Sequence, residues 1–170
     1  MSGLFYFEIQ KIISNLSSDS ISESRKKHLD ELVKIATAQS HELSFKFMGF
    51  RNSHRSIYAQ VWSNVLATQF SLPIKSFSGG FESSSVKDKL IKTLESQGFK
   101  ILKKRGGKEQ VYFVLFSDEQ DPITIYSKKH DDPINPPSDF IAISMSGEIP
   151  ADFLESEMPV FNFYKFTTAC

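Results

Sequence analysis

The chain has 170 residues, of which 40% are hydrophobic, and its lysines plus arginines balance its aspartates plus glutamates at 20 each. This length and composition predict one compact domain with a buried core, and a formal net charge of zero argues against nucleic acid or an anionic membrane as the main partner. The single cysteine, Cys170, excludes an internal disulfide and a cysteine-based metal site. No apolar run is long enough to span a bilayer and no signal-peptide pattern precedes the domain, so we expect a cytoplasmic protein without a membrane partner.

The first 40 residues have the periodicity of helices. In the first segment the apolar residues fall on one stripe, namely Leu4, Phe7, Ile9, Ile12, Ile13 and Leu16. After a Ser-rich break, Ser20 to Glu23 fits a capping box that would begin a second helix. We therefore predict an N-terminal helical extension over residues 1–40. Its apolar stripe either packs on the core or offers a surface for a dimer or a protein partner.

The next part alternates short apolar runs with helical patterns. We predict strands at 43–48 and 73–77, each followed by a helix, at 57–70 and 86–97 respectively. Gly98 is placed to end the second of these helices. This order at short spacing is typical of parallel βαβ units, so the chain is assigned to the α/β class.

From residue 99 onward the pattern changes to short strands separated by turns. The apolar runs at 99–102, 111–116 and 123–126 predict an antiparallel insertion, with the basic KKRGGK turn at a solvated hairpin tip. The proline-rich HDDPINPPSDF segment favours a loop. Residues 140–145 and 160–166 predict a third and a fourth strand of the main sheet.

The loop between the first strand and its helix carries the candidate site, Gly49 to Ser56. In open parallel sheets, ligands bind beyond the carboxyl ends of strands, where helix N-termini point. Gly49, Asn52 and Ser53 permit the backbone to turn so that several N–H groups converge, and Arg55 supplies a guanidinium at the helix start. The side chains of Asn52, Ser53 or Ser56 would hold the loop in shape. A plain strand-to-helix turn with Ser and Asn caps is the alternative interpretation.

The segment FMGFRNSHRSIYAQVW resembles the phosphate-binding loop of the low-molecular-weight protein tyrosine phosphatase and thioredoxin-linked arsenate reductase superfamily. It is most similar to a bacterial phosphatase-like branch with an N-terminal helical extension. The matching residues are Asn52, Ser53, Arg55, Ser56, Gln60 and Trp62. The likeness continues through KSFSGGFESSSVKDKLIKTLESQGFKI and FSDEQDPITIYSKKHDDPINPPSDFIAISMSG. It implies a three-layer αβα fold with a short, mostly parallel four-stranded sheet, formed by residues 41–170 as a single compact unit.

Departures from the family pattern fall on the residues that carry its chemistry. Gly49 stands where the family has its nucleophilic cysteine, and Phe50 replaces a small polar residue. Ser146 and Phe153 stand at the positions of the arsenate reductase redox cysteines. The family's general-acid aspartate should lie near NFYKFTTAC, which contains none, and a closing helix is missing there. A phosphatase of this kind needs both a thiolate and an acid.

These losses predict a pseudoenzyme with no catalytic residue and no cofactor. Its loop would still hold phosphate, sulfate or a phosphorylated ligand through a set of five residues, Asn52, Ser53, His54, Arg55 and Ser56. The alternatives are an active phosphatase or repurposed hydrolase with another nucleophile, for which His54 is a candidate, and a structural protein that acts through the N-terminal helices.

A metal site is a separate possibility at His130, Asp131 and Asp132. Adjacent residues in a proline-rich loop rarely converge on one ion, and Asp132-Pro133 is a good turn former. We therefore expect a turn there and no metal.

Overall fold

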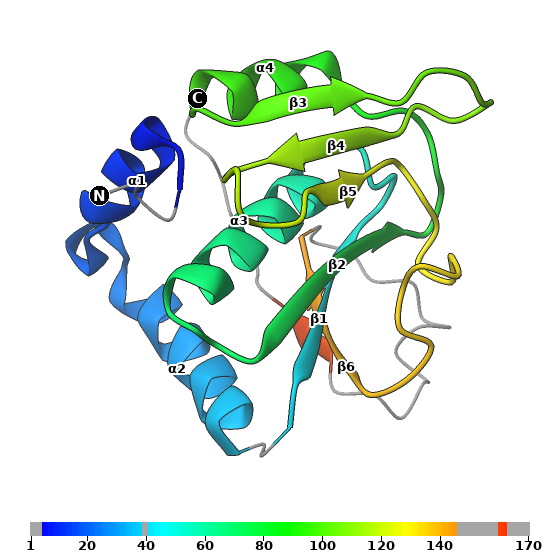
Figure 1. Cartoon of the computed structure of the whole chain (residues 1–170). Coiled ribbons are helices and arrows are strands. Elements are labelled where there is room, and N and C mark those ends of the chain that lie inside the picture. Colours follow the sequence, from blue (N-terminus) through cyan, green and yellow to red (C-terminus); the bar gives the residue numbers. More distant parts are fainter. Residues whose placement is uncertain (1–4, 39–40, 146–159, 163–170) are drawn as a thin grey trace.

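The computed structural model describes residues 5–38, 41–145 and 160–162 and contains two separate sheets (Figure 1). The main sheet has the strand order β2-β1-β6-β7, and every pair of neighbouring strands in it is parallel. Its strands are β1 (Leu43–Gly49), β2 (Ile74–Gly80), β6 (Phe140–Ser144) and β7 (Val160–Asn162). The assignment of the chain to the α/β class is confirmed.

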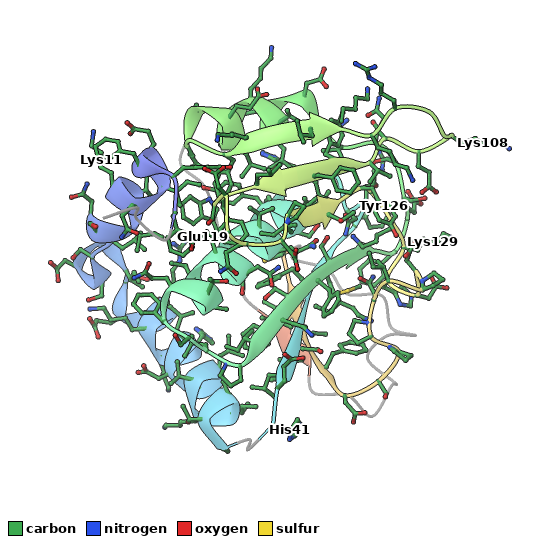
Figure 2. The ribbon with its side chains drawn as sticks, viewed as in Figure 1. Lys11, His41, Lys108, Glu119, Tyr126 and Lys129 are labelled. Atoms are coloured by element: carbon green, nitrogen blue, oxygen red, sulfur yellow. The ribbon has the colours of Figure 1, made fainter. Side chains whose placement is uncertain are left out.

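The predicted insertion forms an antiparallel sheet of its own, with the order β3-β4-β5. The strands are β3 (Lys100–Lys103), β4 (Tyr112–Leu115) and β5 (Ile123–Ile125). Gly106 and Gly107 take positive φ angles of 79° and 98° in the turn between β3 and β4. Lys108 lies at the tip of this turn and points away from the domain, as predicted for the basic segment (Figure 2).

Helix α3 (Arg55–Gln69) lies between the two sheets (Figure 1). One side of it buries Ile57, Val61 and Val65 in the larger core cluster, together with Leu90 and Leu94 of α4 (Asp88–Ser96) and with residues of the antiparallel sheet. The other side faces β2, where the Asn64 side chain accepts a hydrogen bond from the Ser76 N–H and donates one to its carbonyl. Gly98 ends α4 with a φ of +95°, as the sequence predicts.

The N-terminal helices pack on two different parts of the core. Ile9 and Ile13 of α1 (Phe7–Ser14) are buried in the larger core cluster, whereas Phe7 and Leu16 are exposed. After a 3₁₀ turn, η1 (Ser18–Ser20), α2 (Glu23–Ala38) lays Leu32, Ile35 and Ala36 over β1 and β6. None of the residues of α2 is fully buried.

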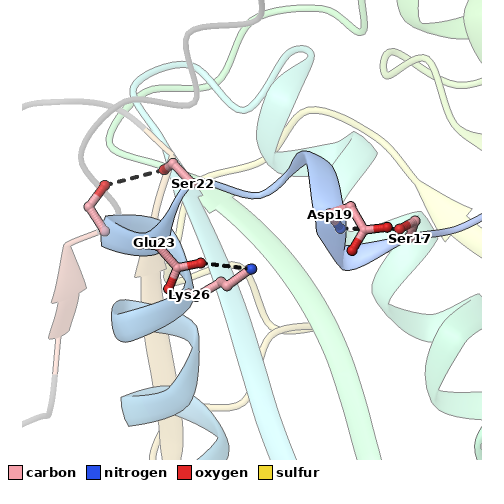
Figure 3. A network of polar contacts seen from close by, with 6 residues as sticks. Ser17, Asp19, Ser22, Glu23 and Lys26 are labelled. Carbon is pink, nitrogen blue, oxygen red and sulfur yellow. Dashed lines mark hydrogen bonds and ion pairs between the residues drawn. The ribbon is translucent and has the colours of Figure 1, made fainter.

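The predicted start of α2 was two residues too early. Ser20 belongs to the 3₁₀ turn, and Ser22 is the residue that precedes the helix. The carbonyl of Ser22 accepts hydrogen bonds from Arg25 N–H and Lys26 N–H, while Glu23 forms an ion pair with Lys26 at 2.9 Å (Figure 3). Glu23 therefore does not close a capping box with Ser20.

Within the described residues, the expected helices on both faces of the parallel sheet are not found. The face that bears Phe45 and Phe47 is covered by α2 and α3, but the opposite face is covered by the 126–139 segment. Lys46 projects from this opposite face, and its ammonium donates to the carbonyls of His130 (3.2 Å) and Pro136 (3.0 Å). It also lies 3.5 Å from the centre of the Phe140 ring. The irregular segment supplies carbonyls that a helix would keep for its own hydrogen bonds.

Some sequence predictions concern residues outside the described ranges. Ser146, Phe153 and Cys170 are among them, and so are residues 163–166 of the predicted last strand. Among the helices that are described, none combines the length and the apolar character required to cross a membrane.

Two buried lysines predict an unusual pH dependence of stability. Burial lowers the pKa of Lys46 and of Lys128 from 10.5 to about 8. Above pH 8 the unfolded chain therefore binds more protons than the folded one, so the free energy of unfolding should rise from pH 8 to pH 10. Lys46→Met should remove roughly half of this rise, because Lys128 supplies the other half. Urea unfolding at several pH values measures it.

The exposed Lys75 of β2 provides the matched control, since Lys75→Met changes an equivalent side chain on the adjacent strand. If the free energy of unfolding of Lys46→Met rose with pH as much as that of the wild type, burial of Lys46 would not lower its pKa. Above pH 10 the free energy of unfolding should fall again. Burial and the hydrogen bond to Asp132 raise the pKa of Tyr126, so the folded chain keeps a proton there that the unfolded chain loses.

Candidate functional site

The loop of residues 50–54 leaves the carboxyl end of β1 and leads directly into α3. β1 has β2 on one side and β6 on the other. The chain therefore goes from β1 to β2 on one side and later forms β6 on the other side of β1. Such a switch point is where open parallel sheets bind ligands. The predicted site therefore lies at a suitable place in the fold.

Two glycines at the end of β2 allow neighbouring backbones to approach this loop closely. A Cβ atom on Gly80 would lie 2.8 Å from the backbone nitrogen of Asn52 and would also collide with the carbonyl of Glu82. A Cβ atom on Gly79 would lie 2.6 Å from the Cα of His130. Only residues without a side chain fit here, because backbone atoms cannot rotate away.

Hydrogen bonds then fix the loop to its neighbours. The Ser127 hydroxyl donates to the carbonyl of Arg51 (2.9 Å) and accepts from the N–H of Ser84 (2.8 Å). The N–H of Glu82 donates to the carbonyl of Phe50, and the N–H of Lys87 donates to that of Ser53. The carbonyls of Phe50, Arg51 and Ser53 are thus bonded to other segments.

Asn52 has the most unusual environment in the loop. Its φ of 44° lies in the left-handed region, which asparagine tolerates better than most residues. The residue is 1% exposed, and within the described residues neither its side-chain oxygen nor its side-chain nitrogen has a hydrogen-bond partner. A buried amide without partners costs free energy, so this loop conformation is maintained by the packing around it.

The start of α3 presents a row of unused donors. The first helical hydrogen bond runs from the N–H of Tyr58 to the carbonyl of His54 (2.9 Å). In the described part of the chain, no partner is recorded for the N–H groups of residues 53–57. The Arg55 side chain is exposed at the first position of the helix, and no described carboxylate forms an ion pair with it. Donors, the helix dipole and a guanidinium therefore coincide.

The electrostatics of the loop are positive. Burial lowers the pKa of His54, and the cationic side chains of Lys89 and Arg55 lower it further. His54 is therefore neutral at pH 7 and adds no charge, but its pKa reports the positive potential of its neighbours. Arg51, by contrast, is engaged with Glu82 at 3.5 Å.

These features surround a pocket of about 200 Å³, lined by residues 49–56 and Met145. The five predicted anion-binding residues, Asn52, Ser53, His54, Arg55 and Ser56, all line it. The expectation that side chains within the loop hold its shape was wrong, because the clamp comes from Ser127 and from backbone bonds. Sequence reasoning missed Ser127 and Met145. The place of Met145, at the end of the predicted strand 140–145, was the one available signal.

Gly49 ends β1 and lines this pocket. A Cβ atom there would lie 2.9 Å from the hydroxyl oxygen of Ser56. A side chain at this position would therefore point toward the start of α3.

The possible metal ligands in the 126–139 segment have other roles. Asp132 accepts hydrogen bonds from the Tyr126 hydroxyl (2.7 Å) and from the Ile134 N–H (3.1 Å). The N–H of Asn135 donates to the Asp132 carbonyl, which closes the predicted turn. No cluster of three or more potential ligands occurs in the described ranges.

Comparisons with protein-family models, with curated proteins and with solved structures find no match to this chain.

The glycine pair predicts a sharp difference between two alanine substitutions. Gly49 and Gly80 are partners in the β1–β2 register. Gly80→Ala forces a Cβ against backbone atoms and should cost about 1–3 kcal/mol of the free energy of unfolding. Gly49→Ala meets only a hydroxyl that can rotate, so it should cost clearly less. Chemical denaturation of both variants measures the difference, and equal losses would contradict the close approach at Gly80.

Proposed function

We propose that this protein is a non-catalytic binding module that holds a phosphate group at residues 49–56, on a fold related to that of the low-molecular-weight phosphatases. The resemblance in the FMGFRNSHRS segment supports the relationship, as does a phosphate-type loop after the first strand of a parallel sheet. The finer features, a four-stranded sheet and the family's αβα layering, belong to this proposal. The ligands that we propose for the loop are inorganic phosphate, sulfate and phosphorylated molecules.

The observation that carries the proposal is the row of N–H groups at residues 53–57 for which the described part of the chain shows no partner. Residues 53–56 of this row line an open pocket, and Arg55 is one of them. A tetrahedral oxyanion has enough oxygens to accept several of these bonds at once.

The expected affinity for inorganic phosphate is low. Hydrogen bonds to charged groups are worth about 1.5–3 kcal/mol each, and capture of the ion costs at least about 4 kcal/mol. A net of about −4 kcal/mol corresponds to a Kd of about 1 mM. The phosphate group would therefore anchor a larger ligand rather than act as the whole ligand.

Absence of catalysis follows from Gly49. Phosphoryl transfer by this type of loop requires a nucleophile at the end of the first strand, and a glycine has no side chain to attack phosphorus. His54 is neutral at pH 7. Its carbonyl accepts the first hydrogen bond of α3, and no described residue is recorded as a hydrogen-bond partner that would orient its imidazole as a base or nucleophile. The geometry therefore supports holding the anion without turning it over.

Removal of the guanidinium should weaken phosphate binding. In a titration followed by amide NMR, wild-type protein should show shifts at residues 53–57 with a Kd near 1 mM. Arg55→Gln should raise the Kd by about tenfold, which corresponds to the loss of one charge-assisted hydrogen bond. Arg105→Gln, in the β3–β4 turn, is the matched control and should bind as wild type does. Wild-type protein that shows no shifts at these amides would refute the anion site.

Wild-type protein and Gly49→Cys should both fail to hydrolyse p-nitrophenyl phosphate above background. The restored thiol would still lack a general acid, and its Cβ would be crowded by Ser56. The decisive measurement is turnover in wild-type protein beside Arg55→Gln. Turnover that is present in the first and lost in the second would show that the protein is an enzyme after all.

A further inference from the structure

A second pocket lies on the same side of the parallel sheet as α3, between that helix, the sheet and α2. Its volume is about 340 Å³, within the range of roughly 300–1,000 Å³ that is typical of small-molecule sites. The sheet contributes Phe45, Phe47, Ile74 and Ile143, and the helices contribute Leu29, Leu32, Ala59, Ser63, Leu66 and Ala67. We call it the apolar groove; Leu72 and Met145 complete its lining.

The groove offers almost nothing to a polar ligand. Ser63 is the one residue with a polar side chain in its lining, and its hydroxyl already accepts a hydrogen bond from the Ser76 hydroxyl at 2.7 Å. A polar group that enters such a groove loses its hydrogen bonds to water without replacement, whereas a hydrocarbon group does not. The part of a ligand that enters the groove must therefore be apolar.

The apolar groove and the anion pocket share one lining residue. Met145 lines both cavities, since it follows β6 directly and lies next to the end of β1. Leu72 precedes β2 and is 48% exposed, so the groove is open to solvent there. The two cavities thus place a hydrocarbon-binding surface beside a set of anion-binding donors.

We propose that the ligand of this protein is a single-chain phosphate monoester, with its phosphate over residues 53–57 and its alkyl chain past Met145 in the apolar groove. This inference rests on the proposed phosphate site and adds the chemical class of the group that the phosphate carries. Charge complementarity selects the head group, because Arg55 has no described carboxylate partner. The apolar lining selects the chain, and each buried methylene contributes about 0.8 kcal/mol.

The packing of α2 fits this role. It covers the groove with Leu29 and Leu32, yet none of its residues is fully buried. A helix held by so little buried surface separates from the sheet at low cost, which would admit a chain. Burial of the alkyl chain between the helix and the sheet would then add to the contact that holds α2.

Methyl NMR of the full-length protein labelled at methionine tests the proposal directly. Decyl phosphate, below its micelle concentration, should bind at least about 30-fold more tightly than inorganic phosphate, because the chain adds apolar burial. The Met145 methyl signal should shift on titration. The Met48 signal should not, because Met48 packs with Phe140 and Ala142 on the opposite face of the sheet. Decanol and decanoate are titrated in parallel.

Substitutions separate the two parts of the site. Ala59→Phe fills the groove and should reduce the affinity for decyl phosphate to that for inorganic phosphate, while phosphate binding itself is retained. If that variant fails to fold, Leu72→Asp at the exposed end should weaken decyl phosphate binding severalfold. Leu102→Asp, which changes a similarly exposed leucine on β3, is its control.

Each outcome has a definite consequence. Phosphate binding without any gain from the decyl chain overturns this inference and leaves the proposed function intact, whereas failure of both ligands to bind overturns both. Equal binding of decanol or decanoate shows that the phosphate is not recognised, which overturns the inference. A stable dimer by light scattering that Ala59→Phe dissociates shows that a second copy fills the groove, with the same consequence.

Discussion

Close contact of three backbone segments at the end of β2 is the constraint on which the rest of the site depends. Gly79 and Gly80 bring residues 51–52 and 128–130 within van der Waals contact of the strand. Hydrogen bonds from Gly80 N–H to the Lys128 carbonyl and from His130 N–H to the Gly80 carbonyl then hold the last of these segments. This packing restricts the path of the loop after β1, and hydrogen bonds to the carbonyls of Phe50, Arg51 and Ser53 hold it there.

The helix that receives this loop is fixed equally firmly, but by polar side chains. Gln60 accepts a hydrogen bond from the Ser78 hydroxyl at 2.6 Å and donates to the Thr124 carbonyl, so it joins the parallel sheet to the antiparallel one through α3. Gln60 and Ser78 are both buried, and each satisfies the other. Because these bonds hold α3 between the two sheets, the start of the helix cannot shift to bring its N–H groups to other acceptors in the loop. The unpaired N–H groups are therefore maintained by the fold, and an anion can satisfy them.

The two faces of the parallel sheet differ in what they can bind. One face is closed by the 126–139 segment, where Lys46 donates to two carbonyls and lies against Phe140. The other face carries phenylalanines under a helix that is only half-buried, and this is where space remains. A phosphate group at the strand ends and an alkyl chain along this open face are compatible with one ligand, because Met145 borders both cavities.

The sequence by itself determined the α/β class, the strand–loop–helix unit around residues 43–70 and five of the residues that line the pocket at this loop. These features depend on local patterns such as apolar periodicity, turn residues and the spacing of Arg55 from the strand. The tertiary structure alone decided that Ser127 holds the loop and that the Asn52 amide lacks partners. It also decided that a proline-rich segment covers one face of the sheet and that Met145 joins two cavities. The contacts of Ser127 with the loop, of the proline-rich segment with Lys46 and of Met145 with β1 all join segments more than 70 residues apart, and no local pattern encodes which distant backbone fills the space beside a glycine.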